Sequence, residues 1–270
     1  MQNLSELLSN DIKSKDSLDI TVILNIWKRD HFQEQLLSLL NQTLLPKEIW
    51  VNQYENHIDL IDTINTCKQY FPNIHHIKSS KNLKYFGRFS LAINVSTTYV
   101  FMIDDDVIPG CKWLESAFEK CNFHNAIISC TGRIIPKGNY LPEQAGELDR
   151  KKHFIGDMTY LFKNYCEGDT QVDYGCNSYF FKTEWLKHYW GTWPATFLSG
   201  EDIHLSATAM VNGGIKTYVI EQKDSDTCGN LKKAYGSDSV ASWRQNDFTK
   251  IREEVLKYHV LKNNWQPLLW

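Results

Sequence analysis

The chain has 270 residues, 42% of them hydrophobic and 13% aromatic, which is enough to bury the core of one large domain. A formal net charge of -3 gives no global basic field, so nucleic acid is not an expected partner. No apolar window is long enough to cross a bilayer, and the polar start lacks a signal-peptide pattern. We therefore expect a cytoplasmic globular protein with no transmembrane segment.

The first half of the chain alternates apolar strands with helices. Strands are predicted at residues 20–26, 48–53, 74–78 and 98–103, and helices at residues 30–41, 57–70 and 86–95. Strands that alternate with helices in this way predict an α/β fold with a parallel sheet and right-handed crossovers.

The second half is less regular. Helices are predicted at residues 111–121, 183–189, 201–212 and 245–261, and strands at residues 126–135, 172–182 and 215–220. Between them, residues 136–170 form a long irregular stretch, and loops of this length in compact domains are typically lids or binding loops. Residues 222–242 form a polar segment that contains Gly229 and Gly236.

Three consecutive aspartates, Asp104, Asp105 and Asp106, directly follow the strand predicted at residues 98–103. In α/β sheets, ligands gather at the carboxyl ends of buried strands. Two carboxylates one residue apart can share Mg²⁺ or Mn²⁺, with substrate phosphates in the ion's other positions. The alternative is that the aspartates cap the following helix, but this explains one of them and leaves two like charges uncompensated. The cluster therefore favours a cation site.

A family resemblance rests on three motifs and on their order over roughly residues 20–220. The motifs are ILNIWKRDHFQEQLLSLLNQTLLPKEIWV, NLKYFGRFSLAINVSTTYVFMIDDDVIP and SGEDIHLSATAMVNGG. Together they resemble a nucleotide-sugar glycosyltransferase of the GT-A fold, most similar to family 2, with some resemblance to exostosin-type hexosaminyltransferases. The resemblance implies a Rossmann-like, mainly parallel central sheet flanked by helices, with an acceptor-side subregion.

The same resemblance implies roles for the acidic residues. Asp104 and Asp106 would hold Mn²⁺ or Mg²⁺, and Asp104 and Asp105 would also face the nucleoside diphosphate sugar donor. Asp202 would be the catalytic base of an inverting transfer, and Glu201 would orient the acceptor or the base. The alternative for this pair is that acidic residues are common at helix N-termini.

Donor and acceptor contacts are also implied. Trp27, Arg29, Asn52, Gln53 and Arg88 would face the donor. Apart from the resemblance, Trp190 and Trp193 would offer flat apolar rings to a saccharide or glycan acceptor, and the alternative is that they are core or loop anchors. The chain departs from family 2 after the second strand, because the acidic residue common there is replaced by a run from Asn52 through Gln53 and Tyr54 to Glu55. Candidates for a C-terminal metal or phosphate contact are His259, Asp224, Asp226, Lys232, Lys233 and Arg244.

The predicted organisation is a polar leader over residues 1–19, a GT-A domain over residues 20–221, and a C-terminal lid segment with a closing helix over residues 222–270. The donor half would span residues 20–110 and the acceptor half residues 111–221. We expect a metal-dependent, inverting hexosyl- or hexosaminyltransferase that uses a UDP-sugar, as in polysaccharide biosynthesis. The alternatives are a retaining exostosin-like enzyme, a sugar-phosphate nucleotidyltransferase, and a carbohydrate-binding module with a structural Ca²⁺.

Overall fold

The computed structural model describes residues 8, 10–138, 150–157 and 163–270. Its central eight-stranded sheet has the order β3-β2-β1-β4-β10-β5-β11-β8, and the pairs β3–β2, β2–β1, β1–β4 and β5–β11 are parallel. These strands are β1 (Ser17–Ile26), β2 (Leu45–Tyr54), β3 (Ile74–Ser79), β4 (Tyr99–Ile103), β5 (Ile127–Ser129), β8 (Thr170–Val172), β10 (Ser178–Lys182) and β11 (Thr217–Val219).

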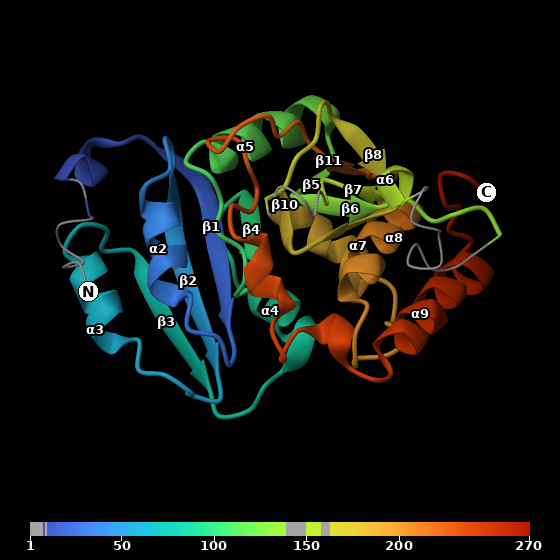
Figure 1. The fold of residues 1–270 in the computed structure, drawn as a ribbon, viewed down its shortest axis with the longest axis horizontal. Coiled ribbons are helices and arrows are strands. Elements are labelled where there is room, and N and C mark those ends of the chain that lie inside the picture. Colours follow the sequence, from blue (N-terminus) through green and yellow to red (C-terminus); the bar gives the residue numbers. More distant parts are fainter. Residues whose placement is uncertain (1–7, 9, 139–149, 158–162) are drawn as a thin grey trace.

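Helices lie on both sides of this sheet (Figure 1). They are α2 (Phe32–Leu40), α3 (Ile61–Lys68), α4 (Lys84–Ala92), α5 (Trp113–His124), α6 (Arg150–His153), α7 (Leu186–Trp190), α8 (Glu201–Gly213) and α9 (Phe248–Lys262). Shorter 3-10 helices are η1 (Asn10–Ser14), η5 (Thr183–Trp185), η6 (Lys233–Ser237) and η7 (Ser242–Arg244). The mixed α/β architecture with a mainly parallel central sheet confirms the predicted fold class.

The central strands are buried on both faces. Residues 20–24 of β1 are fully buried, and so are Val100, Met102 and Ile103 of β4. Strands covered on both faces read as continuous apolar runs without alternation, which is why both were predictable. Because β4 pairs with β1 in parallel register, the residues after Ile26 and Ile103 emerge at the same edge of the sheet.

Two predicted strands are wrong, because each is divided between two sheets. Residues 126–135 form β5 and then β6 (Thr131–Arg133), and residues 172–182 form the end of β8, then β9 (Tyr174–Cys176) and β10. β6 pairs with β7 (Phe154–Ile155) and β9 in a separate three-stranded sheet. At the first break, the Cys130 carbonyl accepts hydrogen bonds from the Asn164 and Gln222 side chains, both at 2.8 Å. At the second, Asn177 has a left-handed φ of 70°.

The ends of the domain differ from the predicted pattern in detail. β1 begins at Ser17, and Leu8 and Ile12 of the predicted leader are buried in the core. The predicted irregular stretch contains α6 and β7, and its residues 139–149 and 158–162 lie outside the described part of the chain. Within the described residues, no helix is both long and apolar enough to cross a membrane.

The loop after β4 is fastened to the C-terminal segment, which we define as residues 222–247. Gly110 donates its backbone N–H to the Cys228 carbonyl at 2.7 Å, and Leu231 donates to the Ile108 carbonyl at 2.8 Å. A Cβ at Gly110 would lie 2.1 Å from the Ser225 carbonyl oxygen. Only glycine permits this approach, which carries the C-terminal segment over the end of β4.

We therefore expect Gly110→Ala to lower the free energy of unfolding by about 3 kcal/mol, because the new methyl group meets backbone that cannot rotate away. Urea denaturation of the two proteins measures this difference. Gly168→Ala is the matched control, since among the described residues, its chain neighbours aside, no heavy atom lies within 4 Å of its Cβ position, and it should change stability by less than about 0.5 kcal/mol. Equal losses of stability in the two variants would contradict the close contact between Gly110 and the C-terminal segment.

Candidate active site

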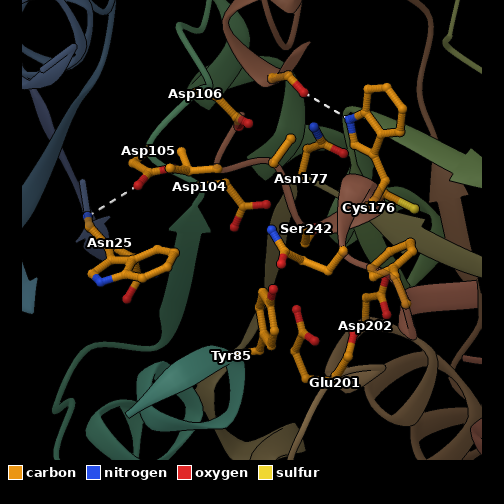
Figure 2. Close-up of a pocket in the computed structure, with 18 of the residues that line it drawn as sticks. Asn25, Tyr85, Asp104, Asp105, Asp106, Cys176, Asn177, Glu201, Asp202 and Ser242 are labelled. Atoms are coloured by element: carbon orange, nitrogen blue, oxygen red, sulfur yellow. Dashed lines mark hydrogen bonds between the residues drawn. The ribbon is translucent and has the colours of Figure 1, made fainter. Parts of the chain in front are cut away.

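A cavity of about 1490 Å³ opens at the carboxyl ends of β1, β2 and β4. Asp104, Asp105 and Asp106 line one side, while Glu201 and Asp202, at the start of α8, line another. Figure 2 shows the carboxylates of Asp104 and Glu201 pointing toward one another. α5 begins at Trp113 with Lys112 as its N-cap, so the aspartates do not cap that helix.

The loop after β1 binds the second and third aspartates. Asp105 accepts a hydrogen bond from the Trp27 backbone N–H at 3.1 Å and one from the Arg29 guanidinium. Arg29 Nη1 also lies 3.1 Å from Asp106 Oδ2. Arg29 thus neutralises part of the charge at the end of β4.

Arg88 joins the two acidic groups of the cavity. Its guanidinium donates to Asp104 and to Glu201, the latter at 2.7 Å, and only 4% of the side chain is exposed. Arg88 was predicted as a donor contact because it precedes the aspartate strand. From α4, Arg88 bridges Asp104 and the start of α8 and also lines the cavity. Its contact with a donor stays a prediction.

Arg252 on α9 binds the second residue of the acidic pair. Its two terminal nitrogens donate to Asp202 Oδ1 and Oδ2 at 2.8 and 2.9 Å. Both side chains are buried, with exposed fractions of 8% and 7%. The sequence analysis did not identify Arg252, because nothing local distinguishes it from the other basic residues of that helix.

Burial and mutual repulsion destabilise the negative charge of several carboxylates. Burial raises the pKa values of Asp105, Asp106 and Glu201 above the ordinary range of such groups, and neighbouring carboxylates add to this rise. The Arg29 and Arg88 guanidinium groups oppose the rise without cancelling it. An additional cation in the cavity would stabilise the ionised forms.

Asp104 and Asp106 offer suitable ligands for such a cation. Among the described residues, Asp106 Oδ1 is buried without a hydrogen-bond partner, and the Asp104 side chain is 31% exposed. Mg²⁺ and Mn²⁺ prefer carboxylate oxygens of this kind. In the described part of the chain, no group of three or more His, Cys, Asp or Glu side chains forms a metal cluster. Asp104 and Asp106 are the residues that would hold such an ion, with substrate or water as its other ligands.

The C-terminal segment packs against the side of the cavity that Arg29 and Asp106 line. Asp238 accepts hydrogen bonds from Arg29 Nε and Nη2 at 2.7 and 3.0 Å. Tyr235 stacks on His31, with ring centroids 3.7 Å apart and an interplanar angle of 9°. A Cβ at Gly236 would lie 2.9 Å from Asp106 Oδ2, so the backbone lies directly against this carboxylate. Figure 1 shows this segment crossing the molecule near β4 and α4 before it reaches α9.

Comparison with known proteins identifies the family. Residues 22–190 match glycosyl transferase family 2. The chain belongs to this family. This match confirms the enzyme class predicted from the sequence, which is a glycosyltransferase.

Two crystal structures of S. aureus TarS are similar to this chain, each at 18% sequence identity over 76% of it. TarS 1-349 aligns with a TM-score of 0.49, and a second TarS structure aligns with a TM-score of 0.52. The alignments span 58% and 35% of those two chains, respectively. The second likeness supports the fold assigned to this family 2 chain. No match is found among curated protein sequences.

The predicted family 2 donor contacts separate into two groups. Trp27, Arg29, Arg88, Asp104 and Asp105 line the cavity, whereas Asn52 and Gln53 are not among its lining residues. β2 extends to Tyr54, beyond the predicted end at residue 53. The Gln53 side chain binds the Ile58 carbonyl and His76, and Asn52 donates to Asn25 and Tyr54.

Glu55 instead occupies the cavity end of β2. It directly follows the strand, lines the cavity, and accepts a hydrogen bond from Trp27 Nε1 at 2.8 Å. The chain therefore has an acidic residue after the second strand of the family 2 fold. The apolar pattern predicted a strand that ended at residue 53, one residue short of its end in the structure, so Glu55 was not recognised as the residue that follows the strand.

The predicted acceptor tryptophans lie outside the cavity lining. Trp193 is 74% exposed and Trp190 packs partly buried against the core, so their contact with an acceptor stays a prediction. Trp243 of the C-terminal segment does line the cavity, is 54% exposed, and donates its indole N–H to the Gly236 carbonyl at 2.9 Å.

Of the C-terminal candidates, Lys233 lines the cavity. His259 is buried against His204, with ring nitrogens 3.1 Å apart. The others do not line the cavity: Asp224 contacts Thr227, Asp226 contacts Lys112, Lys232 contacts Glu34, and Arg244 contacts the ring of the cavity-lining Trp243.

Proposed function

We propose that this family 2 chain transfers a sugar from a nucleoside diphosphate donor, a UDP-sugar, to a saccharide acceptor with inversion at the anomeric carbon. The observation that supports it is the single cavity that brings the three aspartates after β4 together with Glu201 and Asp202. One side of this cavity suits an anionic diphosphate with its cation, and the other side offers a carboxylate to an attacking hydroxyl.

On the donor side, Asp104 and Asp106 would hold Mn²⁺ or Mg²⁺. When bound, the ion neutralises negative charge that develops on the leaving diphosphate. Glu55 would accept the N3–H of uracil, since it lines the cavity at the end of β2 and Trp27 Nε1 fixes one of its oxygens. Arg29 would keep Asp105 and Asp106 in place through its two contacts with them.

On the acceptor side, Asp202 would take the proton of the acceptor hydroxyl as that oxygen attacks the anomeric carbon. The new carbon–oxygen bond forms on the face opposite the diphosphate, and the bond to the diphosphate oxygen breaks with its electron pair. Glu201, which Arg88 ties to Asp104, would orient the acceptor beside the base. This arrangement corresponds to a direct displacement with inversion.

A panel of UDP-, GDP- and dTDP-sugars with Mn²⁺, Mg²⁺ or EDTA tests this function, with release of free nucleoside diphosphate as the readout. We expect release from a UDP-sugar that requires Mn²⁺ or Mg²⁺ and stops in EDTA. Release of pyrophosphate would indicate a nucleotidyltransferase. No turnover of any donor would contradict the proposal.

Trp243 is proposed to stack on a sugar ring of the acceptor, because a half-exposed indole in a saccharide site offers an apolar face to sugar C–H groups. Trp243→Ala is expected to raise the acceptor KM about tenfold, equivalent to about 1.4 kcal/mol, while the donor KM stays unchanged. Steady-state kinetics with each substrate varied in turn measure this. Trp193→Ala is the comparison, and an acceptor KM that rises only there would place the acceptor at Trp193 instead.

A further inference from the structure

Arg252 and Asp202 form a buried pair that the proposed chemistry alone does not require. The guanidinium comes from α9 and the carboxylate from the first turn of α8, 50 residues apart in the chain. The guanidinium carbon of Arg252 also lies 5.2 Å from the Tyr174 ring centroid and 5.1 Å from that of Phe248. Two rings and two hydrogen bonds therefore restrict the position of this guanidinium.

The two carboxylate oxygens of Asp202 accept different numbers of hydrogen bonds. Oδ1 accepts from Arg252 Nη1 at 2.8 Å and from the Ile203 backbone N–H at 2.8 Å. Oδ2 accepts from Arg252 Nη2 at 2.9 Å, and no second donor to it is found among the described residues. Each carboxylate oxygen has two lone-pair directions. Oδ1 therefore has both directions filled, whereas Oδ2 keeps one for a further hydrogen bond.

We infer that Arg252 is a positioning residue that orients Asp202 so that Oδ2 receives the proton of the acceptor hydroxyl. This inference rests on the proposed function. In the transfer step, the proton moves from the acceptor oxygen to Oδ2, while that oxygen bonds to the anomeric carbon and the diphosphate leaves with its electron pair. Arg252 itself loses no proton, since a guanidinium stays charged throughout the working pH range.

The position of Arg252 in the chain gives this pair a second consequence. α9 directly follows the C-terminal segment, whose Asp238 binds Arg29 of the cavity lining and whose Tyr235 stacks on His31. The same stretch of chain therefore covers the donor end and supplies the arginine that holds the base. Residues 235–252 therefore contact both the loop after β1, through Asp238 and Arg29, and the proposed base, through Arg252 and Asp202.

A purely structural ion pair would also lower stability when broken, because removal of one partner leaves a buried charge unpaired. Stability alone therefore cannot identify a positioning role. The separating readouts are the division of the effect between kcat and KM, and rescue by a group that restores the fork of two N–H donors.

The experiment compares Arg252→Ala and Arg252→Lys with wild type, using kcat and both KM values on folded, monodisperse protein. We expect Arg252→Ala to lower kcat about 10²-fold with the donor KM unchanged, because a misoriented base forfeits most of its effect. Millimolar guanidinium should raise the kcat of Arg252→Ala about tenfold. Arg252→Lys keeps the positive charge but not the fork of two N–H donors, so its kcat should lie between those of wild type and Arg252→Ala. Lys257→Ala is the matched control on the exposed face of α9, where Lys257 pairs with Glu253 at 2.6 Å, and it should leave kcat unchanged.

A wild-type kcat in Arg252→Lys together with a lowered melting temperature would overturn the inference, and so would a loss in Arg252→Ala that guanidinium does not relieve. If Arg252→Ala fails to fold, the kcat of Arg252→Lys alone decides. A wild-type protein that turns over no nucleotide sugar would instead refute the proposed function, so the two failures are distinguishable.

Discussion

Replacement of Asp202 by asparagine is expected to lower the kcat of sugar transfer by about 10²- to 10⁴-fold, the usual contribution of a general base. The side chain keeps its shape and still lines the cavity, but an amide cannot take the proton of the acceptor hydroxyl. Donor affinity should stay unchanged, because Asp202 lies on the α8 side of the cavity, away from the aspartates after β4. Initial rates of nucleoside diphosphate release and calorimetric donor binding measure the two quantities.

Glu201→Gln is the matched comparison, since it alters the adjacent carboxylate of the same helix turn. Its partner is Arg88 rather than Arg252, and we expect it to lower kcat less than Asp202→Asn does. Asp202→Asn also removes charge from beside a buried guanidinium, so the variant should lose some stability and its rate must be measured on folded protein. Near-normal turnover in Asp202→Asn would exclude this residue as the base.

Asp106→Ala is expected to abolish the stimulation of turnover by Mn²⁺ or Mg²⁺ and to reduce donor turnover by about 10³-fold. The physical reason is that we propose the buried Oδ1 of Asp106, which lacks a hydrogen-bond partner among the described residues, as a ligand of the cation. Loss of charge neutralisation on a leaving group lowers rates by this order. The measurement is a metal titration of the initial rate in both proteins.

Asp226→Ala provides the control for this change, because Asp226 pairs with Lys112 at 3.2 Å on the surface and does not line the cavity. It should retain the full metal response. Were Asp106→Ala to keep the wild-type rate with Mn²⁺, the aspartates after β4 would have a structural role only.

The sequence carried enough information for the first half of the fold and for the acidic residues of the candidate site. β1 and β4 are buried on both faces, so their apolar runs were visible without any tertiary information. The position of Asp104 follows directly, because it is the first residue after Ile103, where β4 ends. Glu201 at the start of α8 was predictable for a similar reason, since Gly200 precedes the helix and Gly214 ends it.

The parts that could not be predicted depend on contacts between distant segments. The break at Cys130 arises because Asn164 and Gln222, far along the chain, bind its carbonyl. Arg252 reaches Asp202, and Asp238 reaches Arg29, only because α9 and the C-terminal segment fold back onto earlier parts of the chain. No local pattern encodes such a return, so a basic residue that binds the proposed base looks the same in sequence as one exposed to solvent.

The central claim is that the cavity after β4 binds a nucleoside diphosphate together with a divalent cation. Calorimetric titration of UDP into the wild-type protein, once with Mn²⁺ and once with EDTA, tests it most directly. The account predicts one UDP site that is clearly detected with Mn²⁺ and strongly weakened in EDTA. Absence of UDP binding under both conditions, or equal affinity with and without Mn²⁺, would contradict it.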